Sequence, residues 1–338
     1  MKNIVVFDEY QEGDLKPSGL LHKYIELTGI DVEKYFLKAQ KLEACSCPAC
    51  FHSRSAAAFG KFGLGYQECG ACHTLFVSPR PSDHALNEFY RSAPSRIFWR
   101  EELSRATSQK RNEKIVQPRF QWILDSTREY HPRARHLADI NTNQFAYIEE
   151  IARVEDFDQK TLVSPFLGPA ELKTLRGVEI VPGPWWEAGL KNVVDVVTLF
   201  EVADHTADPE ALFKKVREML KPGGLVFMTA IVASGFDVQV LWEKAENLYP
   251  PDRLNVFTVD GLKILFERLG FECLELSTPG VLDVDIVLKA LKENPGIPLP
   301  RFVRGLLEHK DPEIKRAFQE FLQTGLMSSY SRIILRKK

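Results

Sequence analysis

The chain reads Val194-Asp195-Val196-Val197-Thr198-Leu199-Phe200, and this run decides its fold. The segment from Val193 to Phe200 is apolar almost throughout, which is typical of a parallel strand covered on both faces. Asp208 and Pro209 then form the cap and first turn of a helix. Pro222-Gly223-Gly224 ends that helix and turns the chain into another strand. This order predicts an α/β fold with a parallel sheet.

Alternating strands and helices extend the pattern from Arg135 to the C-terminus. We expect the clearest helices at 209–220 and 259–269, and strands at 135–140, 160–165, 178–182, 193–200, 224–231, 271–277 and 329–336. Such alternation predicts helices on both faces of the sheet. Residues 281–326 interrupt it, with prolines near 295–300, and we interpret them as a helical insertion before the last strand.

The totals describe an ordinary globular chain of 338 residues, of which 44% are hydrophobic and 27% charged. This length predicts more than one domain. The net charge of −2 gives no overall attraction to nucleic acid or anionic lipid. The N-terminal residues lack the features of a signal peptide, and no apolar run is long enough to span a bilayer. We therefore expect a cytoplasmic protein with no membrane span.

Cysteines are concentrated in one short segment. Five of the six fall within 28 positions, and Cys47-x-x-Cys50 is separated from Cys69-x-x-Cys72 by 18 residues. Two such turns supply four thiolates for one tetrahedral ion, and thiolates favour zinc. The spacing predicts a closed, structural zinc ribbon over residues 44–80. We expect its neighbours Cys45, His52 and His73 not to bind the metal.

These features divide the chain into four parts. We expect an N-terminal helical segment at 1–43, the zinc ribbon at 44–80, a helical linker at 81–131 and the α/β domain at 132–338. A zinc ribbon offers a surface for a protein partner or for nucleic acid. The basic residues between Arg91 and Arg119 alternate with acidic ones, so we interpret them as a solvated helix face and nucleic-acid binding as unlikely.

The segment from Asp195 to Gly224 resembles the central part of class I S-adenosylmethionine-dependent methyltransferases. The resemblance rests on Phe200-Glu201-Val202-Ala203-Asp204-His205, Asp208-Pro209 and Leu220-Lys221-Pro222-Gly223-Gly224. It continues through residues 251–258 and 269–272. A zinc ribbon ahead of this domain resembles the branch that includes sugar C-methyltransferases. The resemblance implies a Rossmann-like, seven-stranded fold and the cofactor S-adenosylmethionine.

The resemblance also assigns a cofactor loop. Asp139 matches the acid of the family's first motif, but Asn141 and Asn143 stand where the family has glycines. Glycine allows the backbone to approach the cofactor closely, and asparagine tolerates left-handed angles better than other residues. The resemblance implies a cofactor site at Asp139, Asn141, Asn143, Phe145, Phe200 and Glu201. At the second strand Val163-Ser164-Pro165 lacks the acid that holds the ribose, and Asp156 or Asp158 would fill that role only if the strand began earlier.

Candidate catalytic residues lie after the strand that ends at Phe200. His205 would act as a general base, with Glu201 beside the pocket. Trp185 and Trp186 would stack on an adenine or form a lid, and the loop 249–253 would contact substrate. The sequence leaves three functions open: methyl transfer to a small molecule or nucleotide-linked sugar, a non-catalytic binding or scaffold protein on the same fold, and an RNA-modifying enzyme.

Overall fold

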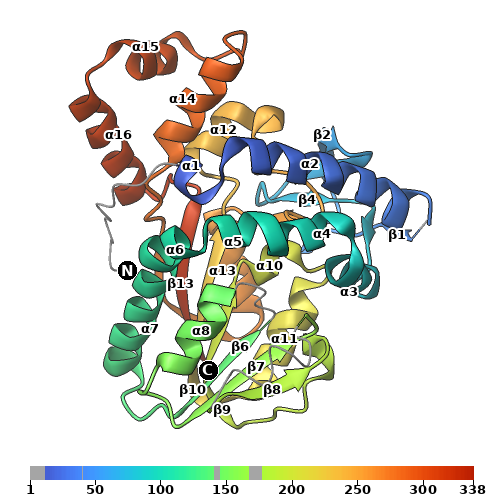
Figure 1. Cartoon of the computed structure of the whole chain (residues 1–338), viewed down its shortest axis with the longest axis vertical. Coiled ribbons are helices and arrows are strands. Elements are labelled where there is room, and N and C mark those ends of the chain that lie inside the picture. Colours follow the sequence, from blue (N-terminus) through green and yellow to red (C-terminus); the bar gives the residue numbers. More distant parts are fainter. Residues whose placement is uncertain (1–11, 40, 141–144, 167–176) are drawn as a thin grey trace.

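The computed structural model describes residues 12–39, 41–140, 145–166 and 177–338 (Figure 1). A seven-stranded sheet forms the centre of the molecule, in the order β12-β13-β10-β9-β6-β7-β8. Six strands are parallel and β13 is antiparallel to both of its neighbours. The strands span β6 (His136–Ile140), β7 (Gln159–Ser164), β8 (Glu179–Pro182), β9 (Val194–Phe200), β10 (Leu220–Ile231), β12 (Phe271–Ser277) and β13 (Tyr330–Lys337).

All seven expected strands are therefore confirmed. β10 begins at Leu220 rather than 224, and its pairing with β9 is irregular between Leu220 and Leu225. Gly223 has a φ of 77°, so the predicted Pro222-Gly223-Gly224 turn is present as a bulge inside the strand. The helix before it ends at Met219, as the turn predicts.

Helices cover both faces of the sheet. On one face, α11 (Pro209–Met219) and α13 (Val259–Arg268) pack against residues such as Val197 and Met228. On the other face, α7 (Gln117–Tyr130) and α8 (Phe145–Arg153) cover Leu137, Val196 and Phe227. Successive strand residues alternate between the two cores, because neighbouring side chains in a strand point to opposite faces. β9 is therefore buried along nearly its whole length.

A second sheet joins the cysteine-rich segment to the C-terminal half. Its order is β11-β4-β3-β2, from β11 (Asn255–Val256), β4 (Leu75–Val77), β3 (Leu64–Cys69) and β2 (Ser55–Lys61). The β11 strand comes from the loop beyond α12 (Phe236–Leu241) and pairs antiparallel with β4. The ribbon segment therefore shares a sheet with the α/β part.

Helices from both ends of the chain lie over the carboxyl edge of the large sheet. The N-terminal elements are α1 (Glu12–Leu15), α2 (Ser18–Val32), η1 (Glu33–Leu37), α3 (Asp83–Ser92), α4 (Pro94–Phe98), η2 (Trp99–Leu103), α5 (Ser104–Ala106), α6 (Ser108–Arg111) and η3 (Asn112–Val116). Between β12 and β13 the chain forms α14 (Asp283–Glu293), α15 (Arg301–His309) and α16 (Pro312–Thr324), which project at the top of Figure 1. Among the described helices, none has the length and apolar character of a bilayer span.

Candidate active site and metal centre

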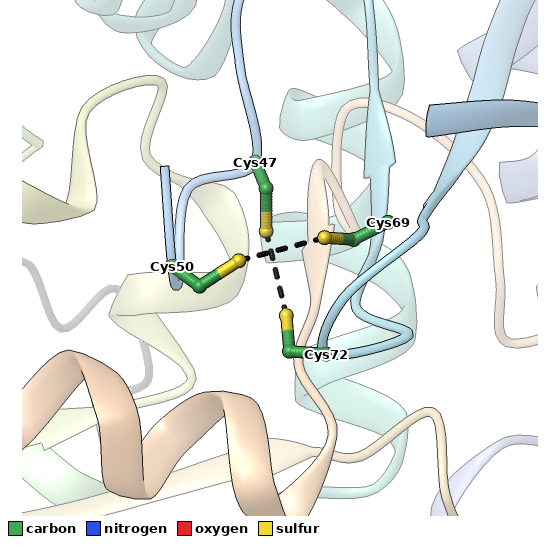
Figure 2. Close-up of side chains that lie close together, drawn as sticks. All are labelled: Cys47, Cys50, Cys69 and Cys72. Carbon is green, nitrogen blue, oxygen red and sulfur yellow. Dashed lines mark hydrogen bonds between the residues drawn. The ribbon is translucent and has the colours of Figure 1, made fainter. Parts of the chain in front are cut away.

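Four cysteine side chains converge from two turns, as Figure 2 shows. The Sγ atoms of Cys47 and Cys72 lie 3.6 Å apart, and those of Cys50 and Cys69 lie 3.5 Å apart. All four sulfurs lie within 4.8 Å of one another. Zn–S bonds of about 2.3 Å in a tetrahedron require S···S separations of about 3.8 Å. The four thiols could therefore hold one metal ion, and Cys45, His52 and His73 are not in this group.

The cysteine turns are attached to the α/β part by hydrogen bonds. Thr258 Oγ1 donates to the Cys72 carbonyl at 2.6 Å and also caps α13. Arg268 Nη1 donates to the Ala49 carbonyl at 2.9 Å. Cys47, Cys69 and Cys72 belong to the same buried cluster as α13. The order of the cysteine turns is therefore coupled to the order of the larger domain.

A cavity of about 280 Å³ lies at the carboxyl edge of the sheet. Its wall includes Phe200 and Glu201 at the end of β9, His205 of α10 (Val202–His205), and Tyr249, Asp252 and Arg253 from the loop before β11. Side chains of α3, α4, η2, α6, η3, α7 and the start of α14 also line it. Ligands of open parallel sheets bind at this edge, so the cavity is the candidate active site.

Glu201 is held in the cavity wall by two arginines. Arg253 Nη2 donates to one carboxylate oxygen at 2.8 Å, and Arg119 Nη2 reaches the other at 3.4 Å. Burial would raise the pKa of Glu201, but the charges of Arg253 and Arg119 outweigh burial and hold that pKa far below its usual range. Glu201 has a left-handed backbone with φ of 62°. Such strain in a residue with a side chain is frequent at functional sites.

His205 lies beside the same arginine. Its Nε2 atom is 2.8 Å from Arg253 Nη1, and its ring stacks on Tyr90. Because a guanidinium only donates, Nε2 accepts this hydrogen bond and the imidazole is neutral. Burial lowers the pKa of His205 to about 4. The lone pair that a general base needs is therefore occupied in this structure.

Asp252 and Arg96 form a buried ion pair at the cavity. Arg96 Nη1 lies 3.0 and 3.1 Å from the two Asp252 oxygens, and the Tyr24 hydroxyl donates to Asp252 at 2.5 Å. The Arg96 guanidinium lies over the rings of Tyr90 and Trp99. Burial would raise the pKa of Asp252, but Arg96 holds it below its usual value. This pair joins the N-terminal helices to the loop before β11.

We expected the basic stretch to form a solvated helix face, and this expectation is wrong for three of its arginines. Arg96, Arg111 and Arg119 are only 3%, 9% and 4% exposed, whereas Arg91 and Arg105 are exposed. The partners of the buried arginines are carboxylates, aromatic rings and polar groups, many of them far away in the sequence, which no local pattern could reveal. Because these arginines face the cavity, they are not available to a surface-bound RNA.

The cofactor residues implied by the resemblance divide into three groups. Phe200 and Glu201 line the cavity, whereas Asp139 is buried and is not among the lining residues; it accepts a hydrogen bond from Thr198 at 2.6 Å. Asn141 and Asn143 lie outside the described residues, as does the Phe145 side chain. Tyr147, Tyr330 and Arg332 also line the cavity, and no sequence motif marks them as site residues.

The Tyr147 hydroxyl is buried and has no hydrogen-bond partner in the described structure. Its ring packs edge-on against Phe200, with centroids 5.1 Å apart. A buried hydroxyl without a partner is rare and is often satisfied by a ligand or water. Trp186 and Phe166 line the cavity from the loops after β8 and β7. The end of β7, Ser164-Pro165-Phe166, carries no carboxylate.

Comparison with a protein-family model agrees with this architecture. A family model described as a methyltransferase domain matches residues 69–276. No curated protein matches the chain. Solved structures that are similar include a SAM-dependent methyltransferase from Thermotoga maritima, with 17% identity, 67% of this chain and 97% of that chain covered, and a TM-score of 0.39. Another, from Mesorhizobium loti, has 12% identity, coverage of 63% and 96%, and a TM-score of 0.40.

Proposed function

Because the chain belongs to the family of methyltransferase domains, we propose that it transfers a methyl group from S-adenosylmethionine to a small molecule. A nucleotide-linked sugar is the acceptor that the sequence resemblance implies. The observation that carries the proposal is the cavity at the carboxyl edge of the sheet, whose wall contains both Phe200 and Glu201 and the loop before β11. Donor and acceptor would both bind in this cavity, where ligands of open parallel sheets are held.

The described residues of the cavity wall offer groups suited to most parts of S-adenosylmethionine, with the exception of the ribose. Trp186 and Phe166 offer aromatic faces for the adenine, and Tyr147 has a buried hydroxyl free to bind a polar group. Arg119 is a buried cation for the methionine carboxylate, and S-adenosylmethionine would supply an electrophilic methyl group. The ribose lacks its usual carboxylate, because β7 ends in Ser164-Pro165-Phe166.

We propose that His205 is a positioning residue and that Glu201 acts through its negative charge in the cavity wall. His205 accepts a hydrogen bond from Arg253 and so orients the guanidinium that holds Glu201. A histidine with a pKa of about 4 is a weak base near neutral pH. The proton that a carbon or hydroxyl acceptor loses on methylation would therefore pass to a base other than His205.

The second candidate is a binding or scaffold protein on a methyltransferase fold. The absence of a carboxylate in Ser164-Pro165-Phe166 and of any glycine from 138 to 146 favours it. It predicts that ligands occupy the cavity without chemistry. The two candidates differ in whether a methylated product forms.

The experiment uses S-adenosylmethionine with a deuterated methyl group and a small-molecule extract, followed by mass spectrometry. The proposed function predicts a product that carries the deuterated methyl. Glu201→Gln should abolish its formation, whereas the matched control Glu187→Gln, at an exposed position outside the cavity, should not. No labelled product despite cofactor binding would establish the second candidate instead.

We propose that the four cysteines bind zinc in a structural role. The sulfur separations fit a tetrahedral ion, and four protein ligands leave no open position for substrate. The metal would fix the turns on which Thr258 and Arg268 are anchored.

A further inference from the structure

The cavity wall carries more positive than negative charge. Among the described residues, seven basic side chains line it: Lys16, Arg96, Arg111, Lys114, Arg119, Arg253 and Arg332. Four acidic ones do so: Asp83, Glu201, Asp252 and Asp283. The net excess of positive charge is unusual, because burying a cation without a partner is costly.

Each acidic side chain is already engaged by its neighbours. Glu201 binds Arg253 and Arg119, and Asp252 binds Arg96. Asp83 accepts from the hydroxyl of Thr206 and from two backbone N–H groups. Asp283 accepts from Ser328, Gln319 and the backbone of Ser329. Among the described residues, no lining carboxylate forms an ion pair with Arg111, Lys114 or Arg332.

Three cations have no carboxylate partner in the part of the chain that the structure describes. Arg111 donates to the Thr107 hydroxyl and the Leu15 carbonyl, at 2.8 and 2.7 Å. The Arg332 guanidinium lies over the Trp122 ring at 5.5 Å, and its buried Nε has no hydrogen-bond partner there. Lys114 is half-buried and forms no ion pair with a described residue. We call these three residues the cationic wall.

The surroundings of Tyr330 are also rich in positive charge. Arg119 Nε lies 3.3 Å from its hydroxyl oxygen. Burial would raise the pKa of Tyr330, but Arg119 and Arg332 together lower it. Burial lowers the pKa of Arg111 to about 10, so Arg111 is still charged at neutral pH. The potential in this part of the cavity is therefore positive, and an anionic ligand would relieve it.

We propose that the cationic wall binds a phosphate group of the methyl acceptor, so that the substrate is a phosphorylated small molecule. This rests on the proposed function. Arg332 offers a guanidinium whose buried Nε has no partner among the described residues, whereas Arg111, whose Nε and Nη2 are engaged, adds its positive charge, as does Lys114. An excess of several positive charges matches a phosphate better than a single carboxylate. Arg119 remains with Glu201 and the cofactor.

The test measures calorimetric binding of inorganic pyrophosphate, inorganic phosphate and acetate, each with and without saturating S-adenosylhomocysteine. Pyrophosphate should bind more tightly than acetate, and S-adenosylhomocysteine should not compete with it. Lys114→Gln and Arg332→Gln should each weaken pyrophosphate binding by about tenfold, the usual loss for one charge-assisted contact. The matched control Arg105→Gln removes an exposed charge of the same helical region and should have no effect.

Three results would overturn the proposal. Equal binding of acetate would make the site a carboxylate site. Competition with S-adenosylhomocysteine would assign the wall to the cofactor. Unchanged pyrophosphate affinity in Lys114→Gln, whose half-buried side chain has no ion pair with the described residues, would show that the wall does not bind anions. If pyrophosphate binds as expected but S-adenosylhomocysteine does not, the cationic wall stands and the proposed function fails.

Discussion

Replacing Asp252 by Asn should strongly destabilise the protein. In the wild type the Asp252 carboxylate accepts hydrogen bonds from Arg96 Nη1, at 3.0 and 3.1 Å, and from the Tyr24 hydroxyl, at 2.5 Å. Asn preserves the shape but removes the charge, and so leaves the buried Arg96 guanidinium, whose side chain is 4% exposed, without a counter-ion. Breaking a buried ion pair in this way costs about 3–5 kcal/mol. Since the Asn oxygen still accepts one hydrogen bond, we expect about 3 kcal/mol.

The assay is urea unfolding at neutral pH, followed by tryptophan fluorescence. The double variant Arg96→Met with Asp252→Asn should recover most of the loss, because neither charge then remains buried. A loss of unfolding free energy below about 1 kcal/mol for Asp252→Asn would refute the reasoning, because it is well under the cost of breaking a buried ion pair. A double variant as unstable as the two single losses added together would also refute it.

The same residue gives a pH dependence with a defined sign. Arg96 holds the folded pKa of Asp252 below its unfolded value. The resulting stability is present above the unfolded pKa of about 3.9 and is lost as the pH falls through the folded value. The variant Asp252→Asn should lack this part of the acid-induced loss, so its unfolding free energy should depend less on pH at the acid end.

Three further predictions concern other parts of the molecule. Cys69→Ser should lose the bound zinc and several kcal/mol of stability, whereas Cys273→Ser should keep the metal; elemental analysis and thermal melting check both. Gly261→Ala should cost about 1–3 kcal/mol, because a Cβ there would clash with Oγ1 of Thr74. Its control, Gly305→Ala in open space, should gain about 0.5–1 kcal/mol. His205 has a folded pKa of about 4, below the unfolded value of about 6.5. Its contribution to the free energy of unfolding is therefore lost as the pH falls from 6.5 toward 4, because only the unfolded state takes up the proton in this range. Wild type should therefore lose about 2 kcal/mol more than His205→Gln between pH 7 and 5, and equal losses would contradict the assignment.

The sequence predicted the elements whose signal is local. The apolar run ending at Phe200 and the turn at Pro222 indicate the sheet, because their periodicity and turn chemistry need no distant partner. The spacing of Cys47, Cys50, Cys69 and Cys72 likewise predicted that four thiols converge, since each pair lies within a single turn. Both predictions concern short segments whose conformation depends mainly on their own residues.

Long-range contacts explain what the sequence did not reveal. β11 is only two residues long, and only its pairing with β4 makes it a strand. The burial of Arg96 depends on Asp252, which lies 156 positions away. A basic residue among glutamates predicts a surface position unless such a partner is known. The cationic part of the cavity is therefore a property of the folded chain that no short segment encodes.

The central claim is that this cavity binds the methyl donor. Calorimetric titration of the wild-type protein with S-adenosylhomocysteine tests it most directly, with Tyr147→Phe as the variant that lacks the buried hydroxyl. The account predicts saturable binding at one site per chain, weakened in Tyr147→Phe by removal of one hydrogen bond. The absence of any binding heat at millimolar ligand would contradict it.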